Sequence, residues 1–233
     1  MKVKKTIYTD GDYLIRNDGW HTEDSPWKAR QIIKILDRNA IRPSTICEIG
    51  CGAGEILNQL HAKLPSGIRY YGYEISPQAH AMALQREKEG LTFLLKDILE
   101  EDVFYDLALI IDVIEHVPDF YGFLQKIKSK ATYKIFHIPL DLSVQTIWRS
   151  KPILTGRKQV GHIHYFTKET ALAALEDSGY TIVDHFYTSG LVELPGKPLR
   201  SKMLIWPRKL LFGINQDFAA RLLGGYSLLV LAK

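Results

Sequence analysis

The segment CEIGCGAGEIL, from Cys47 to Leu57, places three glycines at every second position between two apolar stretches. Glycine has no side chain and adopts positive φ readily, so the backbone can turn sharply there and approach a ligand closely. The apolar residues before the glycines predict a buried strand, and those after them predict a helix whose free N–H groups face a ligand. The segment therefore predicts a ligand-binding turn, with a tight turn that binds nothing as the alternative.

The spacing of the glycines separates two classes of cofactor. Dinucleotide-binding turns follow the pattern G-x-G-x-x-G. Here Gly50, Gly52 and Gly54 follow G-x-G-x-G, and Glu55 stands where the dinucleotide pattern has its last glycine. Because a carboxylate there would repel a pyrophosphate, the spacing counts against a nicotinamide-dependent dehydrogenase, which stays open as an alternative.

Strand and helix patterns alternate along most of the chain. Apolar stretches predict strands over 45–49, 67–75, 91–95, 105–114, 132–140, 181–188 and 226–232. Helical patterns cover 24–41, 53–63, 76–90, 118–130 and 167–180. Ser25, Ser76 and Thr167 are suited to cap three of these helices. The alternation predicts a Rossmann-like α/β fold with a mostly parallel sheet, whose ligands bind at the carboxyl ends of the strands.

Two acidic residues follow predicted strands downstream of the glycine turn. Glu74 ends the second strand, and Asp97 follows the third. A carboxylate at the first place can accept hydrogen bonds from both hydroxyls of a ribose. One at the second place can accept from the amine of an adenine, with the N–H of Ile98 serving a ring nitrogen. Either residue alone could be a solvated charge, but the ordered set favours an adenosine ligand.

These motifs together resemble the class I S-adenosylmethionine-dependent methyltransferases. The resemblance rests on the glycine turn, the two acidic positions and the segment DVIEHVPD over 112–119, and it covers residues 44–187 and the final strand. The chain is most similar to the small-molecule branch typified by the ubiquinone-biosynthesis O-methyltransferases. The resemblance implies a seven-stranded sheet in the order 3-2-1-4-5-7-6 with the last strand antiparallel. The implied cofactor is S-adenosyl-L-methionine, with S-adenosyl-L-homocysteine as its product.

The resemblance also implies which residues bind the cofactor. The glycines would pass under its methionine part, Glu48 would reach the amino group, and Glu74 would bind the ribose. Asp97 with Ile98 would bind the adenine, while Asp112 and Val113 would line the methionine side. The predicted cofactor-binding set is Trp20, Glu48, Gly50, Cys51, Gly52, Gly54, Glu74, Ile75, Asp97, Ile98, Asp112 and Val113.

Several histidines are candidates for activating the methyl acceptor, since histidine titrates near neutral pH. His116, beside Glu115, follows the fourth strand and could act as a base or only brace the next helix. His137 lies in an apolar strand, where it could face the substrate or remain in the core. His162 and His164 alternate, so both could face the acceptor pocket or be polar loop residues. We expect no metal site, because the two cysteines lack clustered histidines nearby.

The ends of the predicted domain have different expected roles. Residues 1–24 are predicted as an N-terminal lid segment and 25–233 as the methyltransferase domain. Tyr8, Tyr13, Trp20 and His21 resemble lid residues that cover the cofactor, although Trp20 could instead fasten the first helix to the core. Residues 191–224 are predicted as a helical cover between the last two strands. Within it, the basic and apolar stretch 197–212 could cover the substrate, form a homodimer contact or lie on an anionic membrane.

Composition limits the remaining classes of function. The 233 residues are 46% hydrophobic and 24% charged, which is typical of a globular protein. No apolar run predicts a membrane span or a signal peptide, so we expect a cytoplasmic location. The net charge of +4 is too small to indicate nucleic acid. The leading hypothesis is a methyltransferase acting on a small-molecule or glycan-linked acceptor, with oxygen as the expected atom; a non-catalytic cofactor-binding module is a further alternative.

Overall fold

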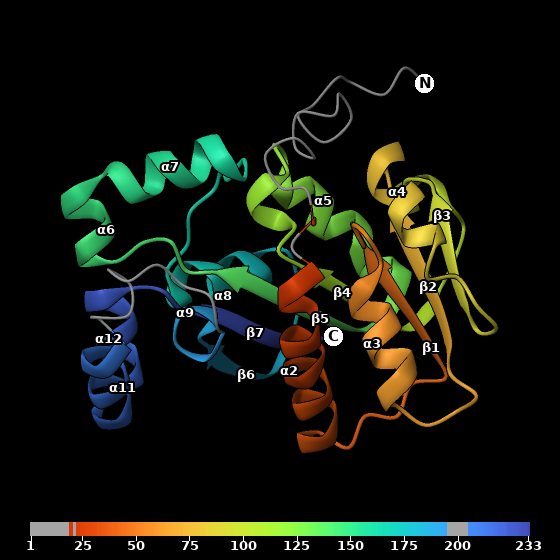
Figure 1. Cartoon of the computed structure of the whole chain (residues 1–233), viewed down its shortest axis with the longest axis horizontal. Helices are drawn as coiled ribbons and strands as arrows, with labels where there is room; N and C mark the ends of the chain where they lie inside the picture. Colours follow the sequence, from red (N-terminus) through yellow and green to blue (C-terminus); the bar gives the residue numbers. More distant parts are fainter. Residues whose placement is uncertain (1–18, 21, 195–204) are drawn as a thin grey trace.

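The computed structural model describes residues 19–20, 22–194 and 205–233. Within these residues one sheet has the strand order β3-β2-β1-β4-β5-β7-β6 (Figure 1). Strand β7 runs antiparallel to β5 and to β6, and the other neighbouring strands are parallel. The strands are β1 Thr45–Ile49, β2 Arg69–Glu74, β3 Leu91–Leu95, β4 Tyr105–Ile111, β5 Ala131–Pro139, β6 Ile182–Thr188 and β7 Ser227–Ala232. The predicted fold class and strand order are confirmed.

Helices cover both faces of the sheet and bury two apolar cores. The main helices are α2 Ser25–Arg38, α3 Glu55–Lys63, α4 Pro77–Leu84, α5 Phe120–Ile127, α6 Val144–Arg149, α7 Lys151–Gln159, α8 Lys168–Asp177, α9 Gly190–Glu193, α11 Ile205–Ile214 and α12 Gln216–Leu223. Helices α2, α3 and α4 pack on one face around Ile46 and Leu107. Helices α5 and α8 pack on the other face around Ala108 and Phe136. Strands β1, β4 and β5 are thus buried on both sides, which explains their continuous apolar character.

The helix starts agree in part with the sequence. The hydroxyls of Ser76 and Thr167 accept hydrogen bonds from the backbone N–H groups of Ala79 and Thr170 and cap α4 and α8. Ser25 is instead the first residue of α2, and no side chain caps that helix. Helix α4 ends at Leu84, well before the predicted Gly90, because residues 88–91 turn directly into β3.

Two helices that the sequence did not predict lie at one end of the molecule. Helices α6 and α7 follow β5 directly, and they project at the side away from β1, β2 and β3 (Figure 1). The pair α11 and α12 also lies at this end, below α6 (Figure 1). Over the described ranges, no helix has both the length and the apolar character needed to cross a bilayer.

The glycine turn between β1 and α3 requires its glycines for two physical reasons. Gly50, Gly52 and Gly54 all have positive φ, which costs other residues backbone strain. Gly54, the N-cap of α3, also lies against the buried ring of Phe93, which a Cβ on Gly54 would approach within 2.5 Å. The turn is therefore fixed both by its own backbone and by the core beneath it.

Replacement of Gly54 by alanine tests this packing. We expect G54A to lower the free energy of unfolding by about 2–4 kcal/mol, because it adds overpacking against Phe93 to the cost of positive φ. Gly67 is the matched control, since it has a φ of +95° but no heavy atom within 4 Å of its added Cβ. Urea denaturation should show G67A losing only about 1 kcal/mol; an equal loss in both variants would contradict the packing argument.

Candidate active site

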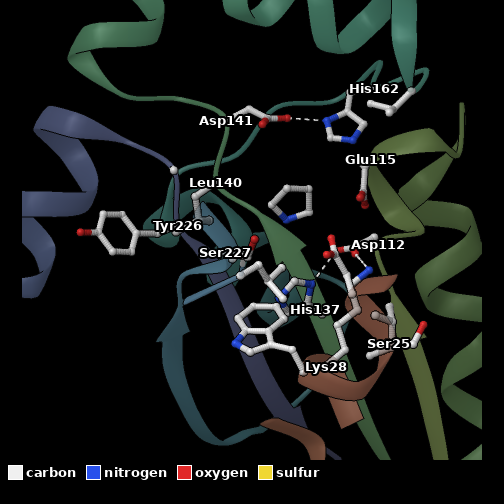
Figure 2. Close-up of a pocket in the computed structure, with 18 of the residues that line it drawn as sticks. Ser25, Lys28, Asp112, Glu115, His137, Leu140, Asp141, His162, Tyr226 and Ser227 are labelled. Carbon is white, nitrogen blue, oxygen red and sulfur yellow. Dashed lines mark hydrogen bonds and ion pairs between the residues drawn. The ribbon is translucent and has the colours of Figure 1, made fainter. Parts of the chain in front are cut away.

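A cavity of about 880 Å³ opens at the carboxyl ends of β1, β4 and β5. The glycine turn and the start of α2 form one wall, and α6, α7 and the loop before α8 form another. Tyr226 and Ser227, at the start of β7, line its end (Figure 2). The cavity lies at the edge of the sheet where the sequence predicts ligand binding.

Glu74 fastens the glycine turn to the end of β2. One carboxylate oxygen accepts the N–H of Gly52 at 2.8 Å, and the other accepts the N–H groups of Ile75 and Ser76 at 2.8 and 2.7 Å. Burial raises the pKa of this carboxyl, although the three backbone donors oppose the shift. Glu74 therefore shapes the turn in this structure, and its oxygens keep further lone pairs for a ligand.

Glu48 lies beneath the turn and is almost completely buried. Within the described part of the chain, one of its carboxylate oxygens has no hydrogen-bond partner. Burial raises the pKa of Glu48 to about 8; nearby Lys28 opposes this rise, while Glu74 and Asp112 add to it. At neutral pH the side chain is therefore mostly a neutral acid that a cationic ligand could ionise.

Asp112 joins three elements at the centre of the site. One of its carboxylate oxygens pairs with the Lys28 ammonium on α2 at 2.7 Å, and the other bonds Nδ1 of His137 on β5 at 2.5 Å (Figure 2). Burial opposes ionisation, but His137 and Lys28 hold the pKa of Asp112 far below its usual range. Nε2 of His137 bonds the Thr188 hydroxyl at 2.9 Å, so this histidine positions Asp112.

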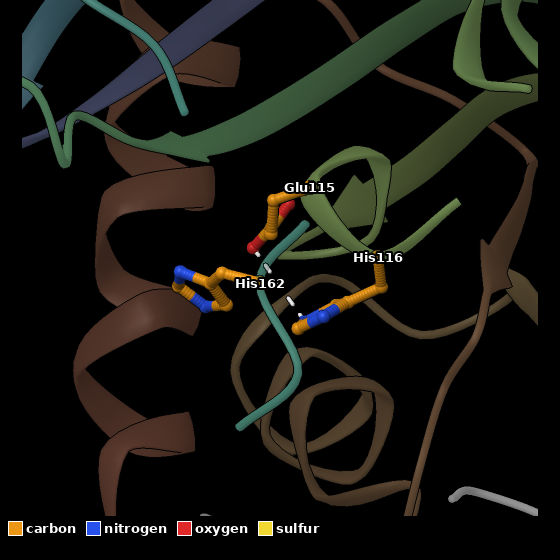
Figure 3. A group of neighbouring side chains, drawn as sticks. All are labelled: Glu115, His116 and His162. Carbon is orange, nitrogen blue, oxygen red and sulfur yellow. Dashed lines mark ion pairs between the residues drawn. The ribbon is translucent and has the colours of Figure 1, made fainter. Parts of the chain in front are cut away.

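Glu115, His116 and His162 form a second cluster facing the cavity (Figure 3). Nδ1 of His162 bonds the carboxylate of Asp141 at 2.6 Å. The Glu115 carboxyl is fully buried, and burial together with the charge of Asp112 raises its pKa well above the usual value. Burial and His162 lower the pKa of His116 to about 4. The sequence-predicted His116, Glu115 and His162 are thus brought together.

The backbone explains this convergence. Residues 161–166 form a loop without regular secondary structure, and the N–H groups of Ile163 and His164 both bond the carbonyl oxygen of Glu115. His164 does not face the cavity; its Nε2 bonds the carbonyl of Val117, and its ring packs on Phe120. The prediction that His162 and His164 share one face is therefore wrong, because the loop is not a regular strand.

The other predicted cofactor residues divide into two groups. Trp20, Glu48, Gly50, Cys51, Gly52 and Asp112 line the cavity. Ile75 and Asp97 are exposed at the ends of β2 and β3, beyond the cavity, while the side chain of Ile98 is buried in the core. Val113 packs against Gly50, and Gly54 sits behind the turn against Phe93.

Both ends of the predicted domain are described only in part. Trp20 lies against Gly52, whose added Cβ would fall 2.7 Å from the indole ring. Tyr8, Tyr13 and His21 of the predicted lid lie outside the described residues, as do residues 195–204 of the predicted cover. Arg208 of that cover is buried and donates to the carbonyl oxygens of Leu223 and Gly224.

Sequence reasoning missed two charged residues of the site. Lys28 lies in the first turn of α2, and Asp141 follows β5. Neither belongs to a spaced motif, and their roles depend on contacts with Asp112 and His162, which are distant in the sequence. The sequence offered one sign of their roles: Lys28 lies near the start of a predicted helix, and Asp141 directly follows a predicted strand.

The sheet order, the glycine turn after β1 and the acidic groups at the carboxyl edge define a Rossmann-like methyltransferase fold. A family model described as "Methyltransferase domain" matches residues 22–185, so the chain belongs to this family. The predicted methyltransferase class is confirmed, and the dehydrogenase alternative is set aside. A search of curated protein sequences finds no significant match.

Solved structures of similar fold act on different substrates. Magnesium protoporphyrin IX methyltransferase of Synechocystis PCC 6803, with bound S-adenosylhomocysteine, has 18% identity and a TM-score of 0.59 over 89% of this chain and 81% of its own. The N-methyltransferase NodS of Bradyrhizobium japonicum WM9, also with that ligand, has 17% identity and a TM-score of 0.56 over 88% and 84%. The cyclopropane synthase MmaA2 of Mycobacterium tuberculosis has 16% identity and a TM-score of 0.58 over 87% and 84%. These likenesses show the shared fold.

The buried acid Glu48 makes a prediction about pH and stability. Its folded-state pKa of about 8 lies above the unfolded value of 4.5, so folding stability is lost as pH rises between these values. We expect E48Q to be more stable than the wild type by about 1–3 kcal/mol at pH 7, with little difference below pH 4.5. Denaturation across this range should show the difference growing with pH. A difference for E48Q that does not change with pH would contradict the assignment.

Proposed function

We propose that this chain transfers the methyl group of S-adenosyl-L-methionine to a hydroxyl oxygen of a small-molecule or glycan-linked acceptor. The ubiquinone-biosynthesis O-methyltransferases, whose motifs the chain resembles, are the guide for oxygen as the accepting atom. The observation that carries the proposal is the single cavity that joins the glycine turn to the cluster of Glu115, His116 and His162. One end of the cavity suits the cofactor's methionine part, and the other suits an acceptor.

The charge of the cavity supports a cationic cofactor. Six acidic side chains and three basic ones are among the described residues that line it: Asp24, Glu48, Glu55, Asp112, Glu115 and Asp141 against Lys28, Arg149 and Arg208. Burial raises the pKa of Glu48 and Glu115, but a sulfonium and an ammonium group are both positive and would favour the ionised form of these acids, so they suit the methionine part of the cofactor. The adenosine would extend past Glu74 toward Ile75 and Asp97, outside the cavity. Glu55 does not oppose this binding, because Arg86 pairs with it at 2.6 Å.

The reaction needs a positioned acceptor and the loss of one proton. The acceptor oxygen attacks the methyl carbon in line with the carbon–sulfur bond, and that bond breaks with its electron pair moving to sulfur. The products are the methyl ether, S-adenosyl-L-homocysteine with a neutral sulfur, and one proton. Positioning supplies much of the rate, and activation of the hydroxyl supplies a further part. His162 is suited to this activation, because Asp141 holds its ring with Nε2 available to the cavity.

Replacement of His162 tests this assignment. We expect H162A to bind S-adenosyl-L-homocysteine like the wild type but to transfer methyl groups about 100-fold more slowly. Calorimetry measures the first quantity. Transfer of radioactive methyl to a panel of phenols, sugar hydroxyls and amines measures the second.

The variant H164A is the matched control, since His164 lies outside the cavity and bonds Val117. It should retain most of the wild-type rate. Failure of the wild type to bind the product at millimolar concentration would contradict the proposed function. Methylation of amines alone would contradict oxygen as the acceptor atom.

We also propose that the outer face of α11 makes a peripheral contact with an anionic membrane. Trp206, Leu210 and Ile214 lie one turn apart along this helix and are 80%, 69% and 74% exposed. The opposite face covers the cavity, because Arg208 lines it. Arg208 is buried and cannot contact lipid phosphates. Lys209 is the exposed cation of this helix within the described residues and could contact them.

Co-sedimentation with vesicles tests the membrane contact. We expect the wild type to bind vesicles rich in phosphatidylserine at low salt, and the double variant W206S/L210S to lose most of this binding. A matched control is F104S, which removes a residue that is 64% exposed just before β4 and does not belong to α11. Absence of wild-type binding, together with a dimer that the double variant dissociates, would assign the same face to a homodimer instead.

A further inference from the structure

We propose that Glu115, His116 and His162 bind one divalent transition-metal ion, and that this ion holds the acceptor hydroxyl beside the transferable methyl group. Ion binding is independent of the proposed function, whereas the ion's role in activating the acceptor rests on it. The ligand atoms of the three residues all lie within 4.8 Å of one another (Figure 3). Glu115 Oε1 and His116 Nε2 are 3.8 Å apart, which leaves room for an ion after a small contraction.

The strongest independent observation that points to a ligand is the Glu115 carboxyl. Its side chain is fully buried and lines the cavity, and neither of its oxygens has a hydrogen-bond partner among the described residues. Buried polar atoms are almost always hydrogen-bonded, so two orphaned oxygens on one carboxyl require a physical cause. One oxygen of the carboxyl points toward the ring of His116, with His162 beside it (Figure 3).

His162 has the outer partner that metal-binding imidazoles use, and His116 lies beside it. Nδ1 of His162 bonds the Asp141 carboxylate at 2.6 Å, which leaves Nε2 to bind an ion. The ring of His116 lies beside that of His162, with its Nε2 3.8 Å from Glu115 Oε1. The two rings meet edge to face with centroids 5.0 Å apart, so they converge on one point without stacking. Asp141 is thus a positioning residue for His162.

The ligand types select the class of ion. Two imidazoles with one carboxylate suit Zn²⁺, Mn²⁺, Fe²⁺ or Co²⁺, whereas Mg²⁺ prefers oxygen ligands alone. Three protein ligands leave coordination positions open, which is the arrangement of catalytic rather than structural metal sites. The charges of Asp112 and Asp141, which act on Glu115, also favour a cation there.

The ion would act on the acceptor before methyl transfer and would replace His162 as the activating group, because Nε2 of His162 would then bind the ion. An acceptor hydroxyl bound to the ion through oxygen loses its proton to solvent more readily, because the cation stabilises the oxyanion. That oxygen then attacks the methyl carbon, and the carbon–sulfur bond breaks with its electron pair moving to sulfur. This assignment reverses the expectation of no metal site, which rested on the cysteines; Cys47 and Cys51 are free, buried and take no part.

Titration of the full-length, untagged chain with Mn²⁺, after treatment with a chelator, tests the site. Loss of the free-ion signal in electron paramagnetic resonance measures stoichiometry and affinity. We expect one ion per chain, displaced by Zn²⁺, which binds such ligands more tightly. E115Q and H162A should weaken binding by at least about 100-fold, and D141N by roughly 10- to 100-fold.

Two controls keep the result decisive. H164A should bind Mn²⁺ like the wild type, because His164 bonds Val117 away from the cluster. E115Q preserves shape, and its thermal unfolding shows whether the variant folds. No binding of Mn²⁺ or Zn²⁺ at millimolar concentration, or equal binding by E115Q and the wild type, would overturn the proposal and identify Glu115 as a buried neutral acid.

The proposed function is measured separately on the same samples. Calorimetry with S-adenosyl-L-homocysteine on the chelated wild type tests the cofactor site without the ion, and we expect normal affinity. Cofactor binding and methyl transfer without metal binding would contradict the metal site alone. Stoichiometric metal binding without cofactor binding would contradict the proposed function alone.

Discussion

The pairing of Asp112 with Lys28 and His137 is the interaction on which the site depends. It joins the start of α2 to the ends of β4 and β5, at a residue whose φ of +54° is unusual for a side chain other than glycine. The backbone N–H of Asp112 also bonds the carbonyl of His137. Asparagine and aspartate tolerate this conformation best among residues with side chains. The strained turn directs the chain after β4 across the top of the sheet, where Glu115 and His116 face the cavity.

Both oxygens of Asp112 bind Lys28 and His137, and among the described residues neither oxygen of Glu115 has a hydrogen-bond partner. The cavity therefore contains the paired carboxylate of Asp112 beside the unpaired carboxyl of Glu115. A second buried acid, Glu48, lies beneath the glycine turn, and one of its oxygens also has no hydrogen-bond partner among the described residues. Burial of ionisable groups without partners costs folding stability, and such groups concentrate at functional sites. The excess of acid is consistent with ligands that bring positive charge to both ends of the cavity.

Much of the fold could be predicted from the sequence because its signals are local. The apolar stretches gave the seven strands, two of them with identical bounds, and Ser76 and Thr167 marked helix starts through contacts within one turn. Helices α6 and α7 could not be predicted, because they bury no residue completely and so carry no apolar stripe. The actual bounds of α4 depend on the turn into β3, which is a tertiary contact.

The site was predictable only where its residues belong to spaced motifs. The glycine turn, Glu115 and His116 were found this way, whereas Lys28 and Asp141 act through partners far along the chain. The different orientations of His162 and His164 also depend on contacts with residues that are distant in the sequence. Their alternation suggested one shared face, but hydrogen bonds from the loop to Glu115 decide that only His162 faces the cavity.

A crystal structure of the full chain with S-adenosyl-L-homocysteine is the most direct measurement of the central claim. The account predicts that the ligand's sulfur lies over Gly50 and Gly52 and points toward Glu115, His116 and His162. It also predicts that the adenosine extends past Glu74 to Ile75 and Asp97. A ligand bound elsewhere, or with its sulfur directed away from the cluster, would contradict the account.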